Sequence, residues 1–430
     1  MTALATPSVD DAAQESPRAS IGSSISEYFA RVRGGDVGAL PAVLGLLALV
    51  SVFSALRPTS FTGAQNIANL INQSSALIVI AMGLVFVLLL GEIDLSAGYT
   101  AGTGASVMAI VATRHDQSWP VAVLAGLATG AVIGASIGLL VSRLGIPSFV
   151  VTLAAFLGLQ GVLLKLVGSQ GTISLHDKTL IAINNNNLPV WGSWVMFVVI
   201  LVGYAGVSVS RALARRRDGL VTDPLAVVLS KVVVIAVLLG LATVFLTQER
   251  GPNPPRVLPN GVHTGASIKG VPEVVVLLLV LLVGLNFLLG RTAFGRHVYA
   301  VGGNAEAARR SGISVQRVKL LCFVMCSTLA AIGGILLTSR DNSVDPKTGG
   351  SDTLLYAVGA AVIGGTSLFG GKGKVMDAVL GGLVIAIIIN GMGLLNASSA
   401  VVYIVTGLVL LVAASVDAIS RRRAMATGRV

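Results

Sequence analysis

The residues whose types could most clearly bind a solute or take part in chemistry form the stretch Gly91-Glu92-Ile93-Asp94-Leu95-Ser96-Ala97-Gly98. Two carboxylates and a hydroxyl, those of Glu92, Asp94 and Ser96, stand between glycines in a chain that otherwise repeats long apolar segments. A charged side chain at membrane depth costs at least about 2.5 kcal/mol, so an acidic residue there indicates a functional site. Glu92, Asp94 and Ser96 are therefore candidate residues of a pathway for a solute.

Two roles are open for this stretch. The apolar run before it, from Ala76 to Leu90, reaches only about 22 Å at helical rise. If the hairpin reaches the cytoplasmic headgroups, Asp94 and Ser96 mainly cap the next helix. If it stops short, they line a gate, where irregular backbone is tolerated because it faces a cavity. The sequence favours the capping role, in a position beside the gate.

Enzymatic chemistry finds no support in the sequence. Residues 371–374 read Gly-Lys-Gly-Lys, but a phosphate-binding loop needs glycine at Thr366 and a hydroxyl residue at Gly373. The four histidines lie on different loops, which disfavours a metal site. Cys322 and Cys326 lie in an apolar run and are expected to be small core residues. We expect no catalytic residue, no metal and no cofactor bound by this chain.

The composition is that of an integral membrane protein. Of 430 residues, 54% are hydrophobic and 11% are charged, and the mean hydropathy is +0.86. A net charge of +11 would suit nucleic acid only if the basic residues formed a patch on a soluble face. They fall between apolar segments instead, so no nucleic-acid partner is expected.

Apolar segments long enough to cross about 30 Å of hydrocarbon follow one another along the chain. The sequence predicts an all-α membrane protein with residues 1–38 as a cytoplasmic tail, 39–420 as the transmembrane domain and 421–430 as a basic cytoplasmic tail. Basic clusters after alternate spans place both termini in the cytoplasm. Twelve spans are predicted, at 39–57, 66–90, 96–113, 120–142, 146–168, 191–210, 225–247, 272–290, 318–338, 353–370, 375–396 and 400–418.

Two features predict how these helices pack and connect. A glycine at every fourth position from Gly126 to Gly138 lets another backbone approach one helix face closely. Contact with a helix of the same chain is favoured over a dimer or sliding face. The outer connections 169–190 and 248–271 are expected to be irregular exposed turns rather than folded domains.

Four amides lie on one stripe at the start of the second span, namely Gln65, Asn69, Asn72 and Gln73. Amides both donate and accept hydrogen bonds, which suits a neutral, polyhydroxylated solute such as a sugar. The sequence allows two roles: lining of the solute pathway by Asn69, Asn72 and Gln73, or hydrogen bonding between helices.

The longest internal connection, within 291–317, predicts a short independent helix. Asn304 is a suitable N-cap, Glu306 lies in the first turn, Arg309 and Arg310 lie in the last turn, and Gly312 follows. So short a helix is marginal alone in water, so we expect it to dock on a partner. The face formed by Ala305, Ala307 and Ala308 suits a shallow protein groove better than a bilayer.

Three of these segments together resemble one family. The stretch 91–98 resembles the G-x-I-D-L-S-x-G signature of permease subunits in bacterial ABC importers of the ribose, xylose and galactoside class. Residues 295–312 resemble the coupling loop of that family and residues 364–368 its late glycine-rich turn. The additional helix pair around 191–247 is similar to the longer xylose-type permeases. Glu92 departs from the family, which often has glycine there.

The resemblance implies a multi-pass protein of the bacterial plasma (inner) membrane that forms a dimer with a second permease copy. It implies an extracytoplasmic sugar-binding protein, and separate ABC ATPase subunits that use ATP and receive the coupling helix 304–312. The solute expected is a pentose such as xylose. Two alternatives stay open: an ion-coupled secondary transporter that uses Glu92 and Asp94, and an ABC permease for a nucleoside or another small polar solute.

Overall fold

The structure is a computed structural model that describes residues 40–168, 171–218, 225–251, 256–257, 263–264 and 267–426. The expected N-terminal tail, 1–38, lies outside the described residues. The boundary expected at 420 falls inside a helix, because α17 (Ser399–Ala426) continues past it.

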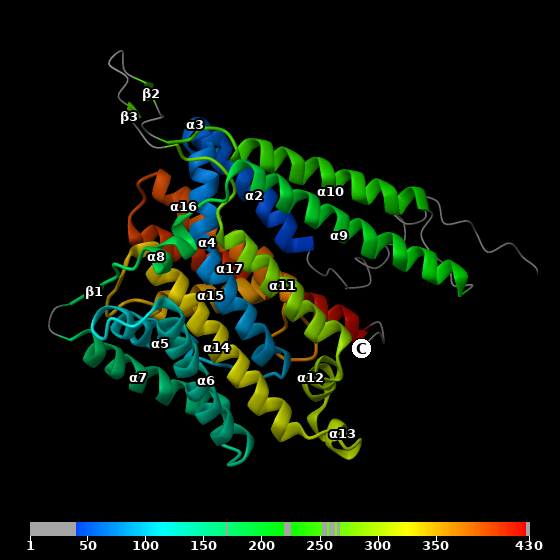
Figure 1. Cartoon of the computed structure of the whole chain (residues 1–430). Helices are drawn as coiled ribbons and strands as arrows, with labels where there is room; N and C mark the ends of the chain where they lie inside the picture. Colours follow the sequence, from blue (N-terminus) through cyan, green and yellow to red (C-terminus); the bar gives the residue numbers. More distant parts are fainter. Residues whose placement is uncertain are drawn as a thin grey trace, which may run out of the picture.

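The described chain is almost entirely helical (Figure 1). Two antiparallel pairs of two-residue strands complete it, in which β1 pairs with β4 and β2 with β3. Besides α17, the helices and strands in chain order are α2 (Leu40–Leu56), α3 (Pro58–Phe61), α4 (Ala64–Leu89), α5 (Ala97–Thr113), α6 (Trp119–Ser142), α7 (Ser148–Val167), β1 (Ile173–Ser174), α8 (Lys178–Asn185), α9 (Val190–Arg217), α10 (Leu225–Leu246), β2 (Arg256–Val257), β3 (His263–Thr264), α11 (Val274–Arg291), α12 (Ala293–Gly303), α13 (Ala305–Arg310), α14 (Val315–Asp341), β4 (Ser343–Val344), α15 (Ser351–Gly364) and α16 (Val375–Leu394).

Every predicted span corresponds to a helix, which confirms the all-α membrane fold. Within the described residues, eight helices are long and apolar enough to cross a membrane: α4, α6, α7, α9, α10, α11, α14 and α16. Helices α2 and α15 and the first part of α17 are apolar but shorter. Helix α5 has 17 residues and is mostly buried by its neighbours. The count of twelve crossings and the orientation of the termini therefore stay predictions.

Helix α15 shows why a predicted span came out shorter. The prediction ran to residue 370, but α15 has 14 residues and ends at Gly364. Gly365 follows in the left-handed conformation with φ +118°, which residues other than glycine adopt only at a cost. The chain then turns, and Asp377 starts α16 by accepting a hydrogen bond from the Lys374 backbone nitrogen at 2.7 Å.

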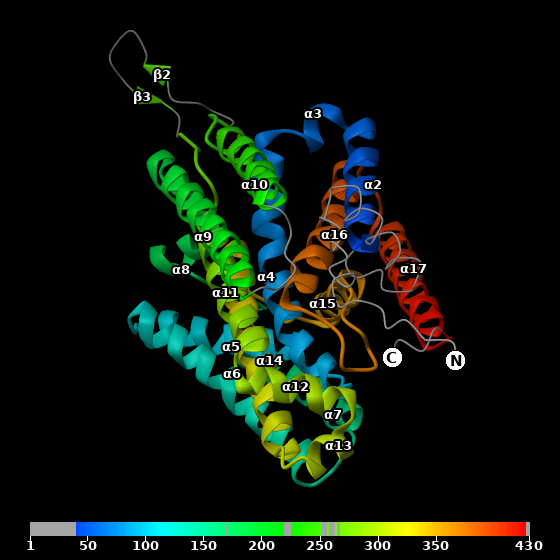
Figure 2. The same ribbon diagram turned by 90° about the vertical axis from the view of Figure 1, so that its right-hand side faces the viewer.

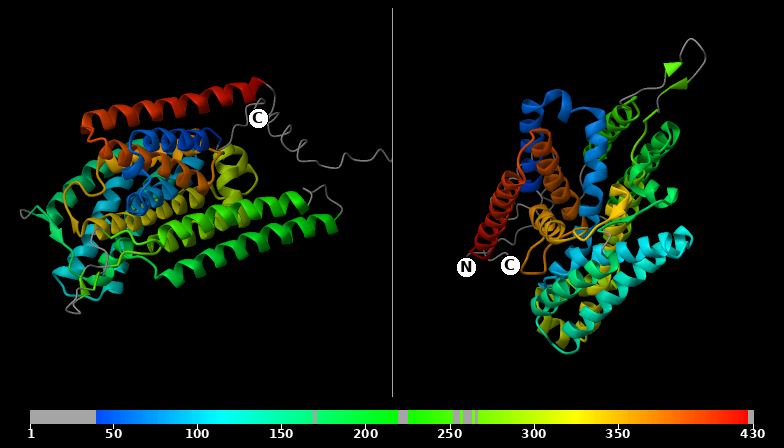
Figure 3. Two further views of the ribbon diagram at one scale, coloured as in Figure 1. Left: turned by 90° about the horizontal axis from the view of Figure 1, so that it is seen from above. Right: turned by 90° about the vertical axis from the view of Figure 1, so that its left-hand side faces the viewer.

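Helix α4 lies in the middle of the bundle, with α9, α10 and α11 on one side and α2, α16 and α17 on the other (Figure 2). In the most apolar 18-residue stretch of α4, 83% of the residues are buried, whereas in the corresponding stretches of α9 and α10 only 6% are buried. Helices α9 and α10 lie side by side along one edge of the bundle (Figure 3). The two outer helices therefore present most of their apolar surface to lipid or to another membrane protein.

The glycine stripe of α6 packs inside this chain, as favoured from the sequence. A Cβ added to Gly126 would lie 2.9 Å from the Gly104 carbonyl oxygen of α5. At Gly130 and Gly134 it would lie 2.7 Å and 2.6 Å from backbone oxygens of α14. The stripe is therefore occupied by α5 and α14, and the alternative of a dimer face on these glycines is wrong.

The outer connection 169–190 is more ordered than predicted. It contains β1 and the helix α8, which begins where the Asp177 carboxylate accepts hydrogen bonds from the backbone nitrogens of Thr179 and Leu180 at 2.8 and 2.9 Å. The expectation of irregular turns is wrong here, because Asp177 is an N-cap and the following apolar residues have a buried surface to contact. In the connection 248–271 the structure describes β2, β3 and the two ends.

Candidate solute pathway and coupling site

The turn between α4 and α5 is where three of the sequence motifs meet. The Leu89 carbonyl at the end of α4 accepts a hydrogen bond from the Gly371 backbone nitrogen at 2.9 Å. A Cβ added to Gly302, at the end of α12, would lie 1.8 Å from the same oxygen. The motifs at 91–98, 295–312 and 364–374 are thus in direct contact at one end of the bundle, although they are far apart in the sequence.

Asp94 is fully buried beside this turn. Its Oδ1 accepts hydrogen bonds from the Ser96 backbone nitrogen at 2.9 Å and from the Ser96 hydroxyl at 2.6 Å. Oδ2 makes no hydrogen bond within the described part of the chain, and the Cys326 thiol of α14 lies close to the carboxyl group. Cys326 and Cys322 are both buried and unpaired.

The capping prediction is wrong in its detail. Ser96 occupies the N-cap position of α5, but its side chain caps no backbone nitrogen. The Asp94 carboxylate binds the nitrogen of the N-cap residue itself and so closes a local turn. Whether this turn also gates a solute stays a prediction.

Glu92 makes an ion pair with Lys319 of α14. The glutamate and lysine side chains are 16% and 24% exposed, so the pair is largely shielded from water. The turn is also fixed to α7, since the Ile93 carbonyl accepts from the Thr152 hydroxyl at 3.2 Å and the Ile93 nitrogen donates to Ser148 at 3.3 Å. Glu92 therefore has a partner within the chain, which the sequence had not indicated.

The short helix predicted at 304–312 is confirmed as α13. The Asn304 side chain accepts a hydrogen bond from the Ala307 backbone nitrogen at 2.9 Å, Glu306 lies within 3.4 Å of Arg310, and Gly312 adopts φ +84°. The sequence missed α12, which directly precedes α13, so most of the segment 291–317 is helical.

The expectation of an alanine face for docking on a partner is wrong for one member. Ala308 is buried against the chain itself, and Ala305 is half-buried. The exposed side of α13 carries Ala307 and three charged residues. Its free surface is therefore mainly polar and charged, which suits a protein surface rather than hydrocarbon. These exposed residues are Glu306, Ala307, Arg309 and Arg310.

The amide stripe begins α4 at the other end of the bundle. Gln65 and Asn69 are exposed, and Asn72 and Gln73 are half-buried. None of the four side chains makes a hydrogen bond to the described residues, and Asn72 Oδ1 is buried without a partner. The hydrogen bonding between helices here comes from Asn66, whose side chain pairs reciprocally with that of Asn390 of α16 at 2.9 and 3.0 Å.

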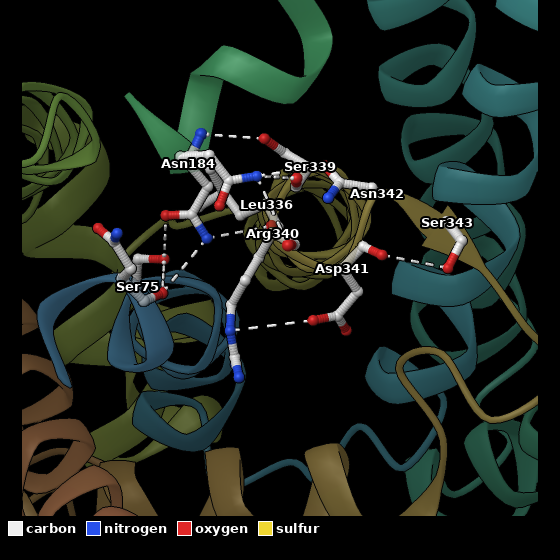
Figure 4. Close-up of polar contacts among 10 residues, drawn as sticks. Ser75, Asn184, Leu336, Ser339, Arg340, Asp341, Asn342 and Ser343 are labelled. Carbon is white, nitrogen blue, oxygen red and sulfur yellow. Dashed lines mark hydrogen bonds and ion pairs between the residues drawn. The ribbon is translucent and has the colours of Figure 1, made fainter. Parts of the chain in front are cut away.

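A second polar cluster that the sequence did not reveal lies next to this stripe (Figure 4). Asn184 of α8 is fully buried. Its side chain donates to the backbone oxygens of Leu336 and Asn72 at 3.2 and 3.3 Å and accepts from the Ser75 hydroxyl at 3.2 Å. Its backbone nitrogen donates to the Ser339 hydroxyl at 2.9 Å. One asparagine thus joins α8 to both α4 and α14 beside Asn72, in the part of the amide stripe nearer the middle of α4.

Comparison with known proteins decides the family. Residues 66–414 match the family model described as branched-chain amino acid transport system / permease component. The chain belongs to this permease family. The matched range contains the motifs at 91–98, 295–312 and 364–374 and, of the amide stripe, Asn69, Asn72 and Gln73. No solved structure matches the chain.

Curated relatives of this permease include sugar transport proteins. The xylose transport system permease protein of Escherichia coli (strain K12) is 33% identical over 381 residues, which cover 89% of this chain and 92% of the relative. The ribose import permease protein of the same strain is 30% identical over 377 residues, covering 87% and 92%. The D-allose transport system permease protein of that strain is 27% identical over 373 residues, covering 86% and 89%. The resemblance seen in the motifs is confirmed.

The candidate site residues of this permease lie at the two ends of helix α4. Asp94 and Glu92 follow the last turn of α4, where Leu89 contacts Gly302 of α12, and the amides occupy its first turns, where Asn72 contacts Asn184 of α8. Figure 1 shows α12 and α8 at opposite ends of α4. Among the described residues no group of three or more His, Cys, Asp or Glu could hold a metal ion.

Proposed function

We propose that the chain is the transmembrane permease subunit of an ATP-driven importer for a pentose such as xylose in the bacterial plasma (inner) membrane. The observation that carries this proposal is the 33% sequence identity to the xylose permease, which extends over 89% of this chain and 92% of the relative. An extracytoplasmic binding protein delivers the sugar, and separate ATPase subunits hydrolyse ATP. The permease itself transports and does not catalyse a reaction.

The ATPase subunit contacts α13 in this proposal. Helix α13 presents Glu306, Arg309 and Arg310 to the outside, and Ala308 attaches it to the rest of the chain. Exposed charges on a short, capped helix suit a cleft on another protein. Helix α13 is attached to the start of α14 by the buried Ala308 and by the hydrogen bond from the Ile313 nitrogen to the Ala308 oxygen, 3.1 Å. This attachment lets α13 pass a displacement to α14.

The sugar contacts the amide stripe of α4. Asn69, Asn72 and Gln73 have side chains that make no hydrogen bonds within the described part of the chain, so their donors and acceptors stay free for a hydroxylated solute. A second permease copy completes the transport unit, and the apolar surfaces of α9 and α10 contact lipid.

Reconstitution tests the proposal. Vesicles are prepared with the permease and its ATPase partner, and binding protein loaded with radiolabelled xylose is added on the outer side. We expect uptake that needs ATP on the ATPase side and that unlabelled xylose suppresses more strongly than ribose, allose or a nucleoside. Suppression mainly by a nucleoside would reassign the solute within the same class of importer.

The ion-coupled alternative predicts the opposite energetics. Uptake without ATP that collapses when the ion gradient is dissipated would establish that rival. The structure offers it little support at Glu92, because this carboxylate is paired with Lys319. A carboxylate that already has a charged partner is poorly placed to exchange an ion.

A further inference from the structure

The turn at 90–96 is fixed to its surroundings by backbone contacts, by the side-chain hydrogen bonds from α7 to Ile93 and by one ion pair. Backbone contacts join it to α12 and to the turn 365–374, through Leu89, Gly302 and Gly371. These contacts need close approach and a fixed geometry. The ion pair between Glu92 and Lys319 is the one charged contact between this turn and α14 among the described residues.

Lys319 occupies a distinctive place in the chain. It lies in the first part of α14, only a few residues after α13. Val315 and Val318, which precede it in α14, are buried in the main hydrophobic core together with Ala308 of α13. Only residues 311–314 separate α13 from α14, so a displacement of α13 by a partner acts directly on the end of α14 that carries Lys319.

Glu92 occupies the matching place on the other side. It follows the last turn of α4, and its backbone nitrogen donates to the Val87 carbonyl at 3.2 Å. It is thus attached to the helix whose opposite end carries the amide stripe. An ion pair that is largely shielded from water is stronger than an exposed one and depends steeply on distance.

We propose that Glu92 and Lys319 form a positioning pair that passes displacement of α12 and α13 to α4, and so couples ATP hydrolysis to movement of the solute pathway. Glu92 is then neither a solute ligand nor a headgroup contact. This inference rests on the proposed ATP-driven function. The pair joins residues 227 positions apart in the sequence and spans the two segments that must move together.

A charge series in the reconstituted transporter tests the pair. The variants are Glu92→Gln, Lys319→Gln and the exchange of both charges, Glu92→Lys with Lys319→Glu. The readout is the amount of xylose taken up per ATP hydrolysed. Changes within coupling networks alter coupling by about two- to thirtyfold, so we expect each single variant to lower this ratio within that range. We expect ATP hydrolysis to continue and the exchange to restore the ratio at least in part.

The ion pair at the other end of α14 provides a matched control. Arg340 and Asp341 lie 3.9 Å apart, and the Asp341 side chain is 59% exposed. Asp341→Asn removes a charge from the same helix away from the turn and should leave the ratio unchanged. Binding of the ATPase subunit to each variant, measured by co-purification, confirms that the transporter is assembled.

The possible outcomes distinguish a failure of the Glu92–Lys319 positioning pair from a failure of the proposed ATP-driven function. ATP-dependent uptake in the wild type with an unchanged ratio in both single variants would overturn the positioning pair and leave the proposed function intact. Single variants with a lowered ratio that the charge exchange does not improve would also overturn it, since loss of packing alone would explain them. Wild-type uptake that is independent of ATP would overturn both inferences.

Discussion

Replacing Gly302 by alanine tests whether α12 and α4 contact as closely as the structure shows. The added Cβ would lie 1.8 Å from the Leu89 carbonyl oxygen, whereas such contacts stay above 3.0 Å, so α12 and α4 must separate by about 1.2 Å. The same Cβ would lie 2.9 Å from the Gly371 nitrogen, which donates to Leu89. Separation would therefore also weaken the hydrogen bond that joins the turn 365–374 to α4.

The change in stability caused by Gly302→Ala is the sum of two opposing effects. Alanine in place of glycine stabilises a helix by about 0.5–1 kcal/mol, whereas overpacking against a rigid neighbour costs about 1–3 kcal/mol. Because the neighbour at Gly302 is backbone, which cannot rotate away, the cost should dominate. We expect Gly302→Ala to lower both the thermal unfolding midpoint of the detergent-purified protein and the initial rate of xylose uptake.

The adjacent residue supplies the control. A Cβ added to Gly303 would meet no neighbouring segment within 4 Å in the described part of the chain, so Gly303→Ala should keep the wild-type uptake rate and leave the unfolding midpoint unchanged or slightly raised. Uptake is compared in vesicles with equal amounts of permease. If Gly302→Ala behaved like Gly303→Ala in both assays, the close contact between α12 and the end of α4 would be refuted.

Two further predictions concern the end of the bundle opposite the turn at 90–96. Asn184→Ala removes three side-chain hydrogen bonds at a fully buried position between α8, α4 and α14 and should lower the free energy of unfolding by about 1–3 kcal/mol. Asn186→Ala, an exposed position whose side chain makes no hydrogen bond to the described residues, should change it little. Equal effects in denaturant unfolding would contradict the role of Asn184. The Ser267 hydroxyl donates to Glu249 at 2.6 Å and is the main cause that lowers the pKa of that carboxyl from 4.5 to about 2. The contribution of Glu249 to stability is therefore present at neutral pH and is lost as the pH falls from about 4.5 to about 2. Ser267→Ala should raise this pKa toward 4.5, measured by the carbon-13 shift of the carboxyl group, and an unchanged titration would contradict the assignment.

Local chemistry determined much of this protein from its sequence. Long apolar runs predicted where the helices lie, because a chain in lipid must satisfy its backbone within each segment. The caps of α13 were predictable because Asn304, Glu306 and Gly312 act within a few residues of their targets. The glycine stripe of α6 predicted close approach, since a missing Cβ is a property of one helix face.

Only the tertiary structure decided which distant residues meet. No local signal pairs Glu92 with Lys319 or attaches Asn184 to Ser75 and Leu336, because these contacts depend on how the helices cross. For α8 the N-cap Asp177 is a local signal, but the surfaces that bury its hydrophobic residues come from other parts of the chain. The sequence determined the segments and their ends, and packing in three dimensions decided which polar side chains of those segments are paired and which stay free.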